Sequence, residues 1–281
     1  MPELPEVETV RRGLVPAMQG QSIKNVTLNR MDLRRAIDPD FKDRLEGAQV
    51  KNLIRRGKYI LAFLDNSSGF VLHLGMSGRI HIYKCGESYE AAKHDHVIWD
   101  MGDGGRIVFN DPRRFGMLYL ISESDWHAHA PFNQMGPEPL SNEFSGQVLY
   151  EALRHKRGPI KTLLLDQRVV SGVGNIYACE ALYEAGIHPE RSGESLEADE
   201  TECLTTSIRN VLTKAIEAGG STLKDYKKTD GSLGYFQYSF SVYDREGRSC
   251  PACGCDTLEA GCVKRIVQSG RSTFYCSRRQ R

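Results

Sequence analysis

The sequence has no long apolar run, no excess of one charge and no leader-like start. Among its 281 residues the longest purely apolar run, 59–64, is six residues long, against the roughly 18 that a membrane-spanning helix needs. Glu3, Glu6 and Glu8 precede every apolar stretch, which is wrong for a secretory signal peptide. Internal repeats, low-complexity segments and nucleotide-cofactor motifs are also missing. These absences favour a cytoplasmic protein and give no support to a cofactor-dependent metabolic enzyme.

The charges nearly cancel, because 37 Lys and Arg face 36 Asp and Glu for a net charge of +1. Net charge therefore neither favours nor excludes nucleic acid as a partner. The cations are unevenly placed, however: residues 260–281 hold six Lys or Arg and no acid, and shorter basic clusters lie at 55–58, 113–114 and 154–157. Any one such cluster is more commonly a solvated face, but together they suit local phosphate binding.

Cysteines are concentrated at the C-terminal end, where five of the eight fall within the last 32 residues. In a chain without a secretory leader, this clustering favours a metal site over disulfides. One C-x-x-C pair is complete, but Arg279 stands where the second pair would end. The predicted zinc ligands are Cys250, Cys253 and Cys276, with a fourth thiolate from Cys255 or Cys262. A metal-free β-hairpin explains the same residues nearly as well.

The periodicity changes along the chain, and the length suits about two domains at roughly 150 residues each. Val7, Val10 and Leu14 recur at helical spacing near the start. Short apolar or alternating runs then predict strands of a sandwich or barrel, at 23–28, 50–54, 59–64, 70–74, 96–101, 106–109 and 117–121.

A Pro/Gly-rich joint at 136–140 separates this β-rich part from a helical part. Helices are predicted from Pro159, after Gly174 and over 198–218, the last ended by Gly219 and Gly220. A long polar loop over 221–234 and a strand over 235–243 are expected next, leading into the cysteine-rich tail.

The first residues suggest nucleophilic catalysis. Removal of Met1 exposes Pro2 as a free secondary amine. An α-amino group has a pKa near 7.7–8.0, against about 10.4 for Lys, so more of it is unprotonated at neutral pH. Such an amine can attack a sugar C1′ to form a Schiff base, and the neighbouring acids Glu3 and Glu6 can shuttle protons. Taken alone, these residues suit an ordinary helix N-terminus better.

Two further patterns suit DNA. The Gly-rich turn before Asn175 places backbone N–H groups at a helix N-terminus, where phosphate binds readily. The turns at 74–78 and 110–116 offer Met76, Arg113 and Phe115. An apolar wedge beside an arginine can fill the space left by an extruded base, although each residue alone is more typical of a core.

The order and spacing of these pieces are far more specific than any one of them. The motifs are PELPEVET at 2–9, RRGKY at 55–59, HLGMSG at 73–78, KHDHV at 93–97, DPRRFG at 111–116, GPEPL at 136–140, GVGNIYA at 172–178, GGSTL at 219–223 and GRSTFYC at 270–276. With them, the chain closely resembles the formamidopyrimidine-DNA glycosylase family of bacterial base-excision repair over essentially its whole length.

The resemblance implies an α+β fold in three domains. These are an N-terminal β-sandwich with a catalytic N-terminal helix at 1–135, a helical helix–two-turn–helix DNA-binding domain at 136–230, and a zinc-finger-type β-hairpin at 231–281. Members of the family usually carry two complete C-x-x-C pairs in this finger, so Arg279 is a departure. The resemblance implies a place in the bacterial cytoplasm at the nucleoid and one zinc ion in the finger, where the fourth cysteine is replaced. Since the sequence has no heptad repeat and no large apolar patch, a monomer is expected.

The resemblance also implies a role for each matching residue. Pro2 would form the Schiff base at C1′, and Glu3 would be the general acid/base, supported by Glu6. Lys58 would donate a proton in β-elimination. Arg271, at the tip of the finger, would assist δ-elimination. Residues that match DNA contacts are His94, Arg113, Arg157 and Asn175. The triad that fills the void comprises Met76, Arg113 and Phe115, with Arg113 facing the orphan cytosine, and the loop 221–234 would close over the flipped base.

The implied activity is a DNA glycosylase and abasic-site lyase that removes 8-oxoguanine and formamidopyrimidines from double-stranded DNA. Two alternatives stay open. An endonuclease VIII-like glycosylase for oxidised pyrimidines is disfavoured by Leu4 and the wedge triad. A non-catalytic binder of damaged DNA, with the altered finger as a sign of lost activity, is disfavoured by the intact Pro2, Glu3, Lys58 and Arg271.

Overall fold

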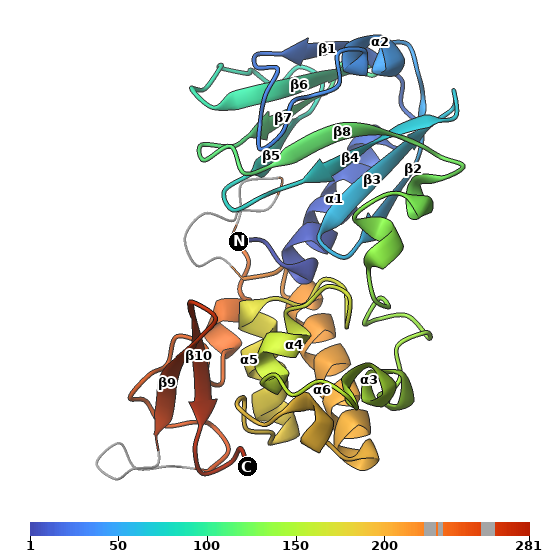
Figure 1. The fold of residues 1–281 in the computed structure, drawn as a ribbon. Helices are drawn as coiled ribbons and strands as arrows, with labels where there is room; N and C mark the ends of the chain where they lie inside the picture. The colour runs from blue at the N-terminus through green and yellow to red at the C-terminus, as the bar shows by residue number, and fades with distance from the viewer. Residues whose placement is uncertain (222–228, 230–232, 254–261) are drawn as a thin grey trace. The chain divides into compact units, whose positions relative to one another are not determined.

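The computed structural model describes the chain except for residues 222–228, 230–232 and 254–261 (Figure 1). Its contacts divide it into two compact units. One comprises Met1–Asn133 and Ala218–Tyr235, and the other comprises Gln134–Glu217 and Phe236–Arg281. The chain therefore leaves the first unit, returns to it and leaves again. The finer division into three domains stays a prediction.

The first unit contains two four-stranded antiparallel sheets, which confirms the predicted sandwich. The strand order of one sheet is β1 (Ile23–Leu28), β6 (Asp95–Met101), β7 (Arg106–Asn110) and β5 (Arg79–Tyr83). That of the other is β2 (Val50–Arg56), β3 (Tyr59–Leu64), β4 (Ser68–His73) and β8 (Met117–Ser122). Trp99 of one sheet stacks on Phe70 of the other with ring centroids 5.8 Å apart, so the core lies between the sheets.

The sequence patterns did not predict one strand of the sandwich, β5. β5 has a single fully buried residue, Ile80, and the rest of the strand is half-buried. Its inward-facing pattern is therefore too short to stand out between the glycine-containing turn before it and the polar segment after it. The short helix α2 (Phe41–Leu45) contacts β1, at the other edge of the same sheet.

Helix α1 (Leu4–Met18) packs on β2, β3 and β5. Val7, Val10 and Leu14 are buried as their spacing predicts. Glu8 also joins α1 to β2 by salt bridges, because its carboxylate lies 2.7 Å from Arg11 and 3.2 Å from Arg55 of β2. Burial alone would raise the pKa of Glu8, but the neighbouring guanidinium groups lower it below its ordinary value. These ion pairs therefore hold α1, and with it the residues at the start of the chain, against β2.

The second unit is helical and carries the hairpin of the predicted finger. Its α-helices are α3 (Gly146–Leu153), α4 (Ile160–Leu164), α5 (Asn175–Ala185) and α6 (Ala198–Glu217). Its hairpin pairs β9 (Val263–Gln268) with β10 (Arg271–Cys276). Short 3-10 helices occur along the chain at Trp126–Ala128, Phe132–Gln134, Gly193–Ser195 and Phe236–Ser239.

The strand predicted over 235–243 is wrong. Phe236–Ser239 forms a 3-10 helix, and the next residues wrap around the carboxylate of Glu180 in α5. This carboxylate accepts hydrogen bonds from the backbone N–H groups of Ser241, Val242 and Tyr243 at 2.8–3.0 Å. Successive N–H groups of a strand point to opposite sides, so three of them cannot converge on one group. Burial raises the pKa of Glu180, against the lowering effect of these hydrogen bonds.

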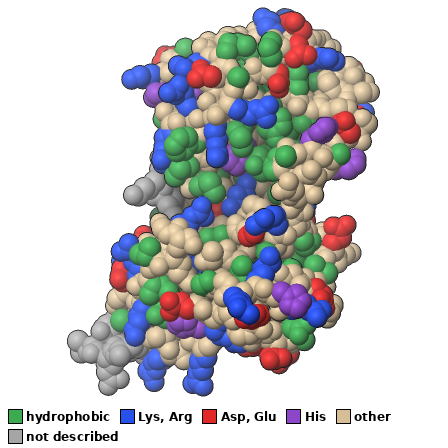
Figure 2. Space-filling model, viewed as in Figure 1, with side chains coloured by type: hydrophobic (Ala, Val, Ile, Leu, Met, Phe, Trp, Pro, Cys, Tyr) green, Lys and Arg blue, Asp and Glu red, His purple; other side chains and the backbone are tan. Residues whose placement is uncertain are grey.

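No helix among the described residues is long and apolar enough to cross a membrane. Lys and Arg side chains are interspersed with Asp and Glu on the face drawn in Figure 2, in keeping with the small net charge. Any strong affinity for phosphate must therefore come from local groups of cations rather than from a uniformly basic surface.

Candidate active site and metal centre

The start of α1 gathers two acids beside Pro2. Glu3 and Glu6 are 3% and 2% exposed, and Pro2 is buried as well. The Glu3 N–H donates to Glu6 Oε2 at 2.9 Å, while the Ser221 N–H donates to Glu6 Oε1 at 2.7 Å. One buried carboxylate therefore fixes both the predicted catalytic N-terminus and the first residue of the predicted base-closing loop.

That loop begins after two glycines in the left-handed region, Gly219 and Gly220, with φ of 75° and 80°. They end α6 as predicted. Most of the loop, at 222–228 and 230–232, lies outside the described residues. Within it Thr229 is described, and its carbonyl oxygen accepts from the Ile82 N–H of β5 at 3.3 Å.

Lys58 follows Gly57 in the tight turn between β2 and β3, and is 8% exposed. Next to it, Tyr59 lies against His73 of β4 with ring centroids 4.7 Å apart. Burial, followed by the positive charges of Lys58 and Arg34, lowers the pKa of His73 to about 4. The Gly75 N–H donates to His73 Nδ1 at 3.1 Å, so the neutral ring carries its proton on Nε2. The sequence alone gives no sign of this role for His73.

This buried neutral ring should make the protein sensitive to acid. A pKa of about 4 in the folded state, against 6.5 in the unfolded chain, corresponds to about 3 kcal/mol. The folded state binds fewer protons than the unfolded chain. The stability that the neutral ring contributes is therefore complete above pH 6.5 and is lost as the pH falls toward 4. Between pH 7 and pH 4, the free energy of unfolding of wild type should fall by about 3 kcal/mol more than that of His73→Asn. This variant keeps an acceptor for the Gly75 N–H. Urea unfolding at pH 7, 5.5 and 4 measures this, and parallel pH profiles would contradict it.

The predicted wedge residues lie on two turns of the first unit that the structure brings together. Met76 lies between β4 and β5, and Arg113 and Phe115 lie between β7 and β8. Met76 is half-buried, whereas Phe115 is 41% exposed, with the Arg113 guanidinium 5.0 Å from its ring centroid. His94 is half-buried nearby, and its carbonyl oxygen accepts from the Asp111 N–H.

In the second unit, Asn175 begins α5 and is fixed by two partners. Lys161, which is fully buried in α4, donates to Asn175 Oδ1 at 2.5 Å, and Asn175 Nδ2 donates to the Ser272 carbonyl at 2.9 Å. Lys donates only and a carbonyl accepts only, so the orientation of the amide is determined. Arg271, beside Ser272, is exposed immediately after the hairpin turn. The structure therefore joins Asn175 to the finger tip, and Lys161 is a contributor that the sequence did not reveal.

Arg157 stands apart from this group. It is exposed, and its guanidinium lies 3.6 Å from Glu194, a pair too solvated to hold it in place. The side chain is therefore accessible to a phosphate group.

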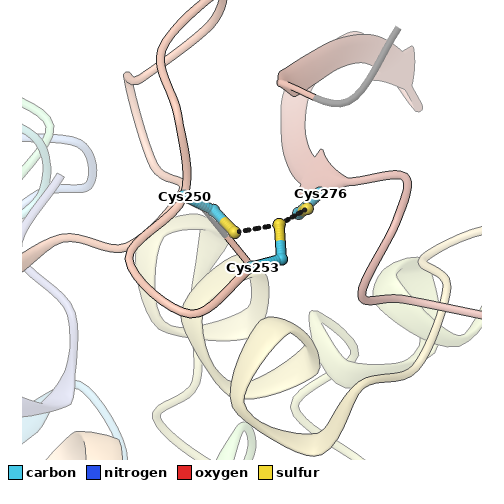
Figure 3. Close-up of side chains that lie close together, drawn as sticks. All are labelled: Cys250, Cys253 and Cys276. Carbon is cyan, nitrogen blue, oxygen red and sulfur yellow. Dashed lines mark hydrogen bonds between the residues drawn. The ribbon is translucent and has the colours of Figure 1, made fainter. Parts of the chain in front are cut away.

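The three predicted cysteine ligands converge at the base of the hairpin (Figure 3). Their sulfur atoms lie 2.9 Å apart for Cys250 and Cys253, 3.5 Å apart for Cys253 and Cys276, and all within 4.8 Å. A zinc ion held tetrahedrally at about 2.3 Å sets its sulfurs about 3.8 Å apart, so these thiols fit three corners of a zinc site. Cys262 is described and does not belong to this group, and Cys255 lies outside the described residues.

Burial alone would raise the pKa of the Cys250 thiol, but hydrogen bonds from Cys253, Tyr183 and Cys276 lower it to about 6. A thiolate at neutral pH is the form that binds metal. Arg279, where a fourth cysteine would stand, points elsewhere. Its guanidinium donates to the carbonyls of Tyr183 and Glu184 at 2.9 and 3.1 Å. It thus caps the C-terminal end of α5 and ties the finger to that helix.

Comparison with known proteins agrees with this geometry. The family model of the formamidopyrimidine-DNA glycosylase N-terminal domain matches residues 1–118, and that of the H2TH domain of the same family matches residues 135–227. The chain belongs to the formamidopyrimidine-DNA glycosylase family. A family member from Roseobacter denitrificans, named formamidopyrimidine-DNA glycosylase, is 50% identical over the whole of both chains.

Solved structures of the family match equally completely. A Lactococcus lactis Fpg mutant in complex with Fapy-dG-containing DNA has a TM-score of 0.88 at 33% identity, with both chains covered over 100% of their length. A MutM in complex with carbocyclic 8-oxo-G-containing DNA has a TM-score of 0.87 at 34% identity, again with 100% of both chains covered. The α+β fold expected from the sequence is therefore confirmed.

Proposed function

We propose that the protein excises oxidised purines from double-stranded DNA and then cleaves the strand at the resulting abasic site. In enzyme terms it is a DNA-formamidopyrimidine glycosylase and a DNA-(apurinic or apyrimidinic site) lyase. The observation that carries the proposal is the buried start of the chain, where Glu3, which follows Pro2, donates its N–H to the Glu6 carboxylate, in a chain that matches the glycosylase family over its full length.

The chemistry follows from the residues at this start. Once Met1 is removed, the Pro2 nitrogen attacks C1′ and the bond from C1′ to the damaged base breaks. The C1′–O4′ bond then breaks, O4′ takes up a proton and the sugar ring opens, which leaves an iminium (Schiff base) between the enzyme and C1′. Glu3 is the proton-transfer group for this exchange. Loss of a proton from the sugar then expels the 3′ phosphate in β-elimination, assisted by Lys58, and δ-elimination assisted by Arg271 expels the 5′ phosphate. The product is a one-nucleoside gap with a phosphate on each side.

The target base must leave the duplex first, because C1′ is shielded inside the stack. Met76, Arg113 and Phe115 would fill the space that it leaves, with Arg113 toward the orphan cytosine. His94, Arg157 and Asn175 would hold phosphates without reading sequence. Binding should therefore weaken steeply with salt. We place the protein in the bacterial cytoplasm at the nucleoid, as a monomer with the three domains 1–135, 136–230 and 231–281.

A substrate panel tests the proposal directly. Duplexes with 8-oxoguanine opposite cytosine, with thymine glycol, and with a preformed abasic site are incubated with the protein. We expect fast cleavage of the first and third and slow cleavage of the second. Preference for thymine glycol would identify an endonuclease VIII-like enzyme, and binding without cleavage of any duplex would identify a damaged-DNA binder.

We further propose that one zinc ion is held by Cys250, Cys253 and Cys276. Of the two predicted fourth ligands, Cys255 is the one proposed, because Cys262 lies outside this group. The ion would fix the base of the hairpin against α5 and take no part in the chemistry.

Metal analysis checks this proposal. Wild type is expected to carry about one equivalent of zinc, and Cys276→Ser below about one fifth of that, because a structural site rarely survives the loss of a thiolate. Cys203→Ala, which removes an exposed thiol of α6, should keep the zinc. Zinc-free wild type would contradict the proposal and favour the metal-free hairpin.

A further inference from the structure

Two buried polar side chains join the turns that carry the wedge, and sequence reasoning assigned neither a role. Ser77 and Asp111 are 3% and 0% exposed. The Ser77 hydroxyl donates to Asp111 Oδ1 at 2.6 Å, across 34 residues of sequence. A bond between a hydroxyl and a carboxylate away from solvent is among the stronger hydrogen bonds in proteins. It therefore fixes one turn to the other.

The pair also holds the backbone on both sides of the wedge residues. Ser77 Oγ accepts from the Arg113 N–H at 3.1 Å, and Asp111 Oδ2 accepts from the Gly116 N–H at 2.8 Å. The Arg114 N–H closes the turn on the Asp111 carbonyl at 3.2 Å. The segment from Arg113 to Gly116 is thus anchored at each end, and the side chains of Arg113 and Phe115 project from a fixed base.

The backbones of the two turns also pack closely against one another at Gly75. Gly75 has φ of 62°, and a Cβ added there would lie 2.3 Å from the carbonyl carbon of Phe115. The turn before Met76 therefore lies directly against the peptide that joins Phe115 to Gly116. This contact determines how far Met76 and Phe115 project relative to one another. The Ser77–Asp111 hydrogen bond keeps the two turns together.

We propose that Ser77 and Asp111 are positioning residues that set which base the enzyme accepts opposite the lesion. The inference rests on the proposed function, because Arg113 is there assigned to the orphan cytosine. Discrimination by a guanidinium depends on hydrogen-bond geometry at the base edge. Loss of the hydrogen bond from the Arg113 N–H would let the guanidinium depart from that geometry. The Schiff-base chemistry at the N-terminus does not depend on the position of Arg113. Selectivity should therefore fall before catalysis does.

The test compares wild type, Ser77→Ala and Asp111→Asn on 8-oxoguanine opposite cytosine or opposite adenine. We expect the cytosine-to-adenine ratio of kcat/KM to fall by about tenfold, the size of one base contact. Cleavage of a preformed abasic site in single-stranded DNA should stay within about twofold of wild type, since no orphan base is present there. Val26→Ala, a buried change in β1 of the same unit, controls for lost stability and should keep the wild-type ratio.

An unchanged ratio in both variants, or an equal fall in Val26→Ala, would overturn the inference while leaving the proposed function intact. A wild-type protein that cleaves neither 8-oxoguanine duplex overturns the proposed function and the inference together. The wild-type arm therefore distinguishes the two failures.

Discussion

A protein with one glycine placed ahead of Pro2 should lose both base excision and strand cleavage by at least about a thousand-fold. The added peptide bond turns the Pro2 nitrogen into an amide, which has neither a free electron pair nor a proton to exchange. Both steps depend on the same iminium, so both should fall together. Single-turnover assays on 8-oxoguanine and abasic-site duplexes measure the two rates.

Pro2→Gly is the matched control, because it keeps a free α-amino group at the same place. It should retain part of both activities and still form the covalent intermediate. An extended protein that cleaves at the wild-type rate would show that another amine, such as that of a lysine, is the nucleophile.

Replacing Glu3 by glutamine should separate the two activities. The change keeps the shape of the side chain and leaves the backbone hydrogen bond from residue 3 to Glu6 in place. It removes the proton-transfer group, so base excision should fall by about 10²–10⁴-fold. Cleavage of a preformed abasic site needs no departing base and should change by less than about tenfold. Rates on the two duplexes under single-turnover conditions give the comparison.

Glu8→Gln controls for the loss of a buried charge on the same helix. Glu8 is 8% exposed and pairs with Arg11, Arg12 and Arg55, so its loss should lower the melting temperature. The rates per folded molecule should stay near wild type. Equal losses on both duplexes for Glu3→Gln would mean that Glu3 maintains the structure and is not the acid/base group.

The sequence predicted the elements whose pattern is local. Seven of the eight strands of the sandwich, α1 and the end of α6 at Gly219 follow from periodicity and from glycine, which adopts the left-handed backbone more readily than other residues. The segment 235–243 could not be predicted in this way. Its backbone is shaped by Glu180, about 60 residues earlier in the chain.

The candidate site shows the same division. Pro2, Glu3 and Asn175 stand in specific motifs and were predicted from the sequence. Their supports were not, because Lys161, His73 and Asp111 act through partners that only the fold brings near. Substitution of the last finger cysteine was visible in the sequence, but that Arg279 caps α5 was not.

Borohydride trapping tests most directly whether the Pro2 nitrogen is the nucleophile. The processed protein is mixed with a duplex that carries 8-oxoguanine opposite cytosine, the imine is reduced, and the cross-linked peptide is mapped by mass spectrometry. We expect a single cross-link, on the nitrogen of Pro2. A cross-link on a lysine, or none even with a preformed abasic site, would contradict it.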